Sequence, residues 1–226
     1  MAKKVSLQRL RLFALIAAIP VVLLGGAVLL TDTGKPLVAH GPIQAGHENT
    51  DCSGCHAPSA GSYRQQIQAN ILYALGQRET PADFGYAPVT SAQCLACHER
   101  KNERHPIYRF REPRFVKALE TVEASSCLGC HSEHADQRVF VEPEFCQACH
   151  ADLNVKNDPI DVPHKTLLAD KSWGTCLGCH DFHGNHPVKA PLTLKAAHSL
   201  DDIRAYLNAG PSPYGDVKTY KAKENE

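Results

Sequence analysis

The sequence contains a single methionine, the initiator Met1, so no site inside the folded chain can use a methionine thioether as a ligand. Acidic residues are absent before Asp32, which leaves the first 31 positions with basic charges alone. An unpaired cysteine is also lacking, because all ten cysteines fall into five Cys-x-x-Cys pairs. Any interpretation of the chain therefore has to explain the five pairs together.

Each of the five pairs is followed directly by a histidine, which makes five copies of Cys-x-x-Cys-His. This pattern is the attachment signature of c-type haem, in which two thiols bond to the two vinyl groups of one porphyrin. The adjacent histidine then reaches the iron from the proximal side. The sequence thus predicts five covalently bound haem c groups. The predicted attachment residues are Cys52, Cys55, Cys94, Cys97, Cys127, Cys130, Cys146, Cys149, Cys176 and Cys179, and the predicted proximal ligands are His56, His98, His131, His150 and His180.

Three other interpretations of the cysteine pairs explain the sequence less well. A tetrahedral zinc site joins two Cys-x-x-Cys turns and needs no histidine after each. A thioredoxin-like redox pair would occur once, between a strand and a helix. A disulfide framework does not account for a histidine after all five pairs.

The sixth position of each iron needs a second ligand, and histidine is the main candidate because methionine is unavailable. Eight histidines remain besides the proximal five. The predicted distal ligands are His47, His105, His134, His164 and His183. His186 and His40 remain alternatives, and an open site or an unusual donor such as lysine is a further one. His198 is interpreted as an ordinary polar residue at the start of a helix over 199–207.

Residues Leu12 to Leu30 form a run of 19 residues without a charge, preceded by four basic residues. A membrane-spanning helix needs about 20 apolar residues, whereas a signal-peptide core has about 7–15. The run therefore predicts an uncleaved single-pass anchor. Its basic end stays in the cytoplasm by the positive-inside rule, and the rest is periplasmic at the bacterial inner membrane. A cleaved signal peptide, cut before Val28, is the alternative.

The remaining chain is too short to bury five haems in an aliphatic core, since it offers only about 40 residues per haem. We expect a mostly α fold with extensive loops, a small haem-cored domain on one N-terminal transmembrane helix. Helices are predicted over 63–75, where apolar residues recur every four positions up to Gly76, and over 114–122. The predicted divisions are a cytoplasmic end 1–11, an anchor 12–30, a linker 31–46, a haem domain 47–210 and a flexible tail 211–226.

The zero formal charge hides an uneven distribution. Residues 31–226 hold 20 basic against 24 acidic residues, which gives −4 before any haem propionates are added. An acidic domain is a poor match for nucleic acid. It suits a redox partner with a basic docking patch, so we expect a periplasmic redox protein and the membrane itself as partners, with quinol as a further candidate.

The five motifs, the Cys-x-x-Cys-His-x-x-His forms at 127–134 and 176–183, and the anchor resemble the membrane-anchored and periplasmic multihaem cytochromes c, including cytochrome c3-like and NrfB-like carriers. The layout is also similar to the NapC/NirT/NrfH quinol dehydrogenases and to the pentahaem subunit of alternative complex III. The NapC/NirT/NrfH group commonly has four haems and some members use a methionine, from which this chain departs. The pentahaem nitrite reductases carry one motif ending in lysine, whereas all five motifs here end in histidine.

The resemblance implies an electron carrier with no catalytic residue of its own, which passes electrons from a quinol-linked membrane donor to a periplasmic partner. A quinol dehydrogenase, or a subunit of a quinol-oxidising complex, is the alternative, and a multihaem reductase is a third. The quinol alternative needs a proton acceptor near the membrane, for which Asp32, Asp51 and His40 are candidates.

Overall fold

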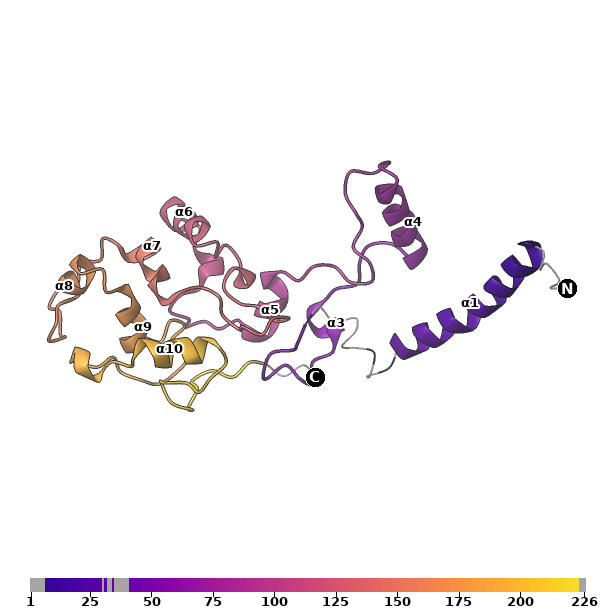
Figure 1. The fold of residues 1–226 in the computed structure, drawn as a ribbon. Coiled ribbons are helices and arrows are strands. Elements are labelled where there is room, and N and C mark those ends of the chain that lie inside the picture. The colour runs from indigo at the N-terminus through magenta and orange to yellow at the C-terminus, as the bar shows by residue number, and fades with distance from the viewer. Residues whose placement is uncertain (1–6, 30, 32–33, 35–40, 224–226) are drawn as a thin grey trace. The chain divides into compact units, whose positions relative to one another are not determined.

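The computed structural model of the chain describes residues 7–29, 31, 34 and 41–223 (Figure 1). These residues form helices joined by long loops, and within the described ranges there are two isolated β-bridges and no β-strand. The expected mostly α fold is confirmed at that level. The longer helices are α1 (Leu7–Leu29), α4 (Tyr63–Ala74), α5 (Ser91–His98), α6 (Pro113–Thr121), α8 (His164–Ala169) and α10 (Leu200–Leu207). The short helical segments are α3 (Cys52–Cys55), η1 (Ile107–Arg109), η2 (Cys127–Gly129), η3 (Pro143–Cys146), α7 (Gln147–His150), η4 (Trp173–Thr175), α9 (Cys176–Cys179) and η5 (Leu194–Ala196).

The chain divides into two compact units, which are described separately. The linker unit comprises Met1–Gln44 with Glu133–Asp136, and the motif unit comprises Ala45–Ser132 with Gln137–Glu226. All five Cys-x-x-Cys-His motifs belong to the motif unit. The sites formed by these motifs can therefore be compared with one another.

Helix α1 is long and apolar enough to cross a membrane, and its described side chains are exposed. It begins at Leu7, five residues before the uncharged run, so it includes Arg9 and Arg11. Helical hydrogen bonding continues through charged residues as readily as through apolar ones, since both are good helix formers. This helix is compatible with the predicted single-pass anchor.

In the linker unit, two short segments are joined through the backbone and the side chain of Gln44. The backbone N–H of Gln44 donates to the Glu133 carboxylate at 2.9 Å, and its side-chain amide donates to the Ala135 carbonyl at 2.6 Å. A Cβ atom at Gly41 would lie 2.0 Å from the backbone oxygen of His134, so glycine is needed at that close approach. These contacts fix the loop that carries His134.

Helix α4 confirms the predicted helix over 63–75, but its apolar stripe faces outward. The exposed residues of the stripe are Tyr63, Ile67, Ile71 and Leu75. The inward face is polar: Gln66 is 4 % exposed, donates to the carbonyls of the preceding loop and accepts from Gly85 N–H at 2.9 Å. Burying this amide is favourable because it satisfies loop backbone groups that would otherwise lack partners.

The apolar core of the motif unit is small and lies between α9 and α10, which are in contact (Figure 1). Its buried members are Leu177, Ile203 and Tyr214, with Phe145, Phe182, Val188, Tyr206 and Leu207 packed around them. Helix α10 begins after Ser199, whose hydroxyl accepts from Asp202 N–H at 3.1 Å as an N-cap. Helix α6 confirms the other predicted helix and buries Ala118 and Leu119.

The segment predicted as a flexible tail makes specific contacts with the motifs. The Tyr214 hydroxyl donates to the Leu177 carbonyl at 2.5 Å, and the Tyr220 hydroxyl donates to the Cys97 carbonyl at 2.6 Å. The backbone N–H of Lys223 also donates to the Cys97 carbonyl at 3.1 Å. Residues 212–223 thus join the turn of the fifth motif to that of the second.

Candidate haem-binding sites

The five motifs form short helical turns, which we number sites 1 to 5 by their proximal histidines His56, His98, His131, His150 and His180. In sites 1, 3 and 5 the backbone N–H of the histidine donates to the backbone carbonyl of the first cysteine at 2.8–2.9 Å. This bond closes the turn, so that both thiols and the histidine come from one compact loop. The two-residue gap of the motif is the reason, because it matches one helical turn.

Two of the turns also need the glycine that precedes their second cysteine. A Cβ at Gly129 would lie 2.1 Å from the Glu123 carbonyl oxygen, and one at Gly178 would lie 2.7 Å from the His198 carbonyl oxygen. Both obstacles are backbone atoms, which cannot rotate away as a side chain could. The close packing of these turns therefore depends on glycine.

Four of the five proximal histidines face a predicted distal histidine. The pairs are His98 with His47 at 5.9 Å between ring centres, His150 with His105 at 6.1 Å, His131 with His183 at 6.1 Å, and His180 with His164 at 6.2 Å. Each pair joins residues that are distant in the sequence or belong to different motifs. Such pairs are the arrangement expected of two axial ligands.

The ring separations agree with an iron between the two imidazoles. A histidine nitrogen binds a first-row metal at about 2.0 Å, and the ring centre lies roughly 1.2 Å behind that nitrogen, so two opposed ligands have ring centres about 6.4 Å apart. Aromatic rings in simple contact also lie about 4.5–7 Å apart, so the distance alone does not distinguish the two cases. The hydrogen bonds of the distal rings add a second observation.

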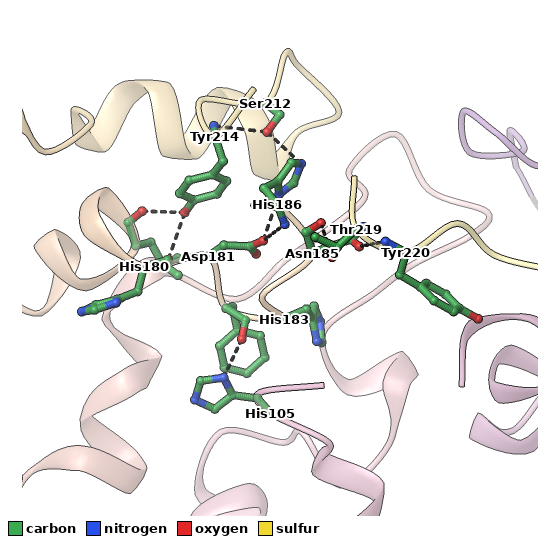
Figure 2. Close-up of polar contacts among 12 residues, drawn as sticks. His105, His180, Asp181, His183, Asn185, His186, Ser212, Tyr214, Thr219 and Tyr220 are labelled. Carbon is green, nitrogen blue, oxygen red and sulfur yellow. Dashed lines mark hydrogen bonds and ion pairs between the residues drawn. The ribbon is translucent and has the colours of Figure 1, made fainter. Parts of the chain in front are cut away.

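Three of the four distal rings are held by their Nδ1 atoms. His105 Nδ1 bonds to the Phe182 carbonyl at 2.5 Å, His183 Nδ1 to the Glu103 carboxylate at 2.7 Å, and His164 Nδ1 to the Asp158 carboxylate at 2.9 Å (Figure 2 shows the first). A metal-binding histidine typically donates its other nitrogen to a carbonyl or carboxylate, which fixes the tautomer. In each case Nε2 is left for a metal. The residues therefore fit bis-histidine haem c.

Burial keeps several of these imidazoles neutral, which is the form that binds a metal. Burial lowers the pKa of His131 to about 4, and the neighbouring His183 and Arg138 act in the same direction. Burial likewise lowers the pKa of His105 and of His180. Burial alone would raise the pKa of Glu103, but the hydrogen bond and charge of His183 lower it overall, so this carboxylate is ionised.

Neighbouring motifs touch one another along the chain order. Helix α3 of site 1 contacts α5 of site 2, and α5 contacts η2 of site 3. The Cys127 thiol, which hydrogen-bonds to the Cys94 thiol, has its pKa lowered to about 6. The same contact between Cys146 and Cys176 joins sites 4 and 5 and lowers the pKa of Cys176 to about 7. Sites 1–2–3 and sites 4–5 are thus two contiguous groups.

Sites 3 and 4 meet through the side chain of Phe182. His105, the predicted distal residue of site 4, stacks on this ring with 4.3 Å between ring centres and 11° between ring planes. His183, the predicted distal residue of site 3, contacts the same ring at 4.8 Å between ring centres and 74° between ring planes. The two groups of sites are therefore joined into one series from 1 to 5.

At site 1, His56 is oriented by its own neighbours. Its Nδ1 bonds to the Ala87 carbonyl at 3.0 Å, and its ring lies 5.9 Å from that of Tyr86. The remaining predicted distal ligand, His134, belongs to the linker unit. Its role as an iron ligand stays a prediction, as do those of the four paired distal histidines.

The other histidines differ from the four paired ones. His186 is 1 % exposed, and both its ring nitrogens are engaged: Nδ1 bonds to Asp181 at 2.9 Å and Nε2 to the Ser212 hydroxyl at 3.2 Å (Figure 2). His198 precedes α10, and its ring lies edge-on to Tyr214 at 5.6 Å. His40, the other alternative, lies outside the described residues, as does Asp32.

Sequence reasoning did not single out Glu103, Asp158 or Phe182. Glu103 and Phe182 lie 80 and 77 positions from the histidines they hold, so no local pattern marks them. Asp158 lies six residues before His164 and could have been noticed as an acid near a histidine. Acids near histidines are common on protein surfaces, so this signal is weak.

Comparisons with known proteins agree with the haem interpretation. Residues 37–140, less than half of the chain, match a family model described as outer membrane cytochrome MtrC/MtrF-like, domains II/IV. The high-molecular-weight cytochrome c of Nitratidesulfovibrio vulgaris strain Hildenborough is 23 % identical over 159 residues, which is 70 % of this chain and 24 % of that protein. The chain therefore spans about a quarter of the length of this curated relative. No solved structure matches the chain.

These two matches, with the five motifs, support a multihaem cytochrome that binds haem c covalently. The activity that such cytochromes share is electron transfer. How many haems the chain binds, where it resides and what it reacts with belong to the proposal that follows.

Proposed function

We propose that this chain is a pentahaem cytochrome c that relays electrons from a quinol-linked membrane donor to a periplasmic redox partner. It performs no substrate chemistry of its own. Bound haem c supplies the one-electron chemistry of iron, and the residues of the chain hold each group, supply its axial ligands and fix its neighbours.

The pairing of four proximal histidines with four distal histidines, at 5.9–6.2 Å, carries this proposal. An iron with two histidine ligands has no open position for a substrate, so it exchanges electrons without binding one. The carboxylates of Glu103 and Asp158 add to this effect, because a carboxylate bonded to a ligating histidine raises its basicity and favours the oxidised iron. We therefore expect low-potential haems at sites 3 and 5.

The order of the sites supports a relay. The contacts between motifs run from site 1 to site 3 and from site 4 to site 5, and Phe182 joins sites 3 and 4. A continuous series of sites gives an electron a path through the motif unit. Site 1 lies nearest in sequence to α1, so we propose that electrons enter there from the membrane.

The membrane part of the proposal rests on α1. A single apolar helix preceded by basic residues is suited to hold the chain in the bacterial inner membrane with its N-terminus in the cytoplasm. Haem c is attached outside that membrane, so the motif unit would be periplasmic. The family description of the matching model names outer membrane cytochromes, and the location test below separates the two membranes.

A quinol dehydrogenase, or a subunit of a quinol-oxidising complex, is the second candidate, and α1 favours it because it would bring site 1 to the source of quinol. The purified full-length protein in detergent, mixed with a reduced quinol, separates the two. Haem reduction without an added donor protein supports the dehydrogenase. A relay stays oxidised until its donor is added.

The reductase alternative is tested with the reduced full-length protein and no partner. Nitrite, hydroxylamine and sulfite are offered in turn, and reoxidation is followed by the haem absorption bands. A relay should react slowly with all three. Turnover at roughly 1 per second or faster, which is typical of enzymes, would contradict the proposal.

A further inference from the structure

We propose that the loops 100–105 and 180–185 form a reciprocal junction, in which each loop supplies the distal histidine of one haem site and orients the distal histidine of the other. The junction makes Phe182 and Glu103 positioning residues for sites 3 and 4 together. This inference rests on the proposed bis-histidine relay and adds to it the element that couples its two halves.

The hydrogen bonds between the two loops are reciprocal. Loop 100–105 carries His105, whose Nδ1 bonds to the Phe182 carbonyl at 2.5 Å. Loop 180–185 carries His183, whose Nδ1 bonds to Glu103 at 2.7 Å. Each loop thus holds the ring that the other presents, and neither ring can move without shifting the loop that holds the other.

Two further contacts clamp the loops together. The Arg100 guanidinium donates to the Asn185 side-chain oxygen at 2.9 Å and also to the His183 carbonyl. These two bonds add a charged donor to the hydrogen-bonded junction. The Glu103 side chain is 10 % exposed and the His183 side chain 38 % exposed, so the carboxylate end of their bond is shielded from water. A shielded, charge-assisted bond holds a ring more firmly than an exposed one.

The Phe182 ring lies between the two distal histidines. It stacks on His105, with 4.3 Å between the ring centres and 11° between the ring planes. It contacts His183 edge-on, with 4.8 Å between the ring centres and 74° between the ring planes. Phe182 also contacts Phe145, with ring centres 5.1 Å apart, and packs against the apolar core. A ring supported in this way fixes the plane of His105, and with it the orientation of that ligand on its iron.

The same loop begins with His180, the proximal residue of site 5 (Figure 2). Asp181 anchors this part, because its carboxylate accepts from His186 N–H at 2.8 Å and bonds to the His186 ring at 2.9 Å. His180, Phe182 and His183 therefore belong to or contact three sites, and Asp181 anchors the loop that carries them. The junction is the place where a local change should alter more than one haem.

The test compares matched aromatic variants of the full-length protein. Phe182→Leu removes the stack on His105 and the contact with His183, Phe182→Tyr keeps the ring, and Phe110→Leu removes a stack on Phe115 with a ring-centre distance of 4.9 Å. Oxidised proteins are compared by EPR, and redox components are resolved by titration. His105→Met and His183→Met identify the components of sites 4 and 3.

If the junction exists, Phe182→Leu shifts two of the five haem redox components, those of sites 3 and 4. Phe182→Tyr gives the same spectrum as the wild type. Phe110→Leu should shift none. A change in one component alone, in none, or equally in all five would overturn the junction. If Phe182→Leu fails to fold, the comparison of the two carboxylates below still decides.

The second comparison uses two carboxylates that hold distal histidines. Glu103→Ala breaks a bond between the two loops, whereas Asp158→Ala breaks one within a single loop, six residues from His164. The junction predicts two shifted components for Glu103→Ala and one for Asp158→Ala. One component for each would refute it, even if the wild type proves to be a low-spin relay. High-spin iron at sites 3 and 4 of the wild type would instead contradict the relay itself.

Discussion

Replacing Glu103 by glutamine tests how the chain sets the potential of a single haem site. The amide keeps the shape of the side chain, and its oxygen can still accept the Nδ1–H of His183, now held at 2.7 Å by the carboxylate. The substitution therefore removes a charge and leaves the geometry. Because the ring stays in place, site 3 alone should respond.

The size of the response follows from the two kinds of hydrogen bond. A bond to a charged group contributes about 1.5–3 kcal/mol and a neutral one about 0.5–1.5 kcal/mol, so the charge contributes about 1–1.5 kcal/mol. For a one-electron couple, about 59 mV corresponds to a factor of ten, or about 1.4 kcal/mol. If the whole difference favours the oxidised iron, the potential of site 3 rises by roughly 45–65 mV, which is an upper bound.

The assay is a redox titration of the full-length protein, with the components resolved by absorption and EPR. Glu142→Gln is the matched control, because Glu142 is an exposed carboxylate paired with Arg204 at 3.4 Å. The control should leave every potential unchanged. A fall in the potential of site 3, or an equal rise at all five sites, would refute the assignment of Glu103 to the His183 ligand.

Three further predictions follow from other parts of the chain. His186→Gln should leave every haem low-spin in EPR, because both nitrogens of His186 already have partners, and a new high-spin signal would make it a ligand. Gly129→Ala should lower the free energy of unfolding by about 1–3 kcal/mol through overpacking against the Glu123 carbonyl, and unchanged thermal unfolding would contradict that clash. The protein should be recovered in the inner-membrane fraction, and N-terminal sequencing should show a start at or near Met1. A start near Val28 would show a cleaved signal peptide. Recovery in the outer membrane would contradict the proposed location.

Local parts of the structure could be predicted because their signals are local. The apolar residues of α4 recur every four positions, and Gly76 follows with φ +71°, which an L-residue adopts reluctantly. Ser62 with Gln65 and Thr90 with Gln93 form capping boxes at the starts of α4 and α5. The motif turns lie within five residues, so each cysteine pair already implies its own histidine.

The pairing of histidines could not be read from the sequence, because it depends on contacts between distant segments. His131 and His183 lie 52 positions apart, and no repeat relates them. His183 and His186 occur in the same short segment, and what separates their surroundings is Asp181, which bonds to His186. The direction of the α4 stripe was equally hidden, because a polar face that satisfies loop carbonyls competes with an apolar one for the interior.

We propose that five haem c groups, most of them with two histidine ligands, make this chain an electron relay. Quantitative EPR of the oxidised full-length protein tests it most directly, with spins counted against protein concentration. The account predicts about five low-spin ferric irons per chain, one for each Cys-x-x-Cys-His motif. Three or fewer irons, or a spectrum dominated by high-spin iron, would contradict it.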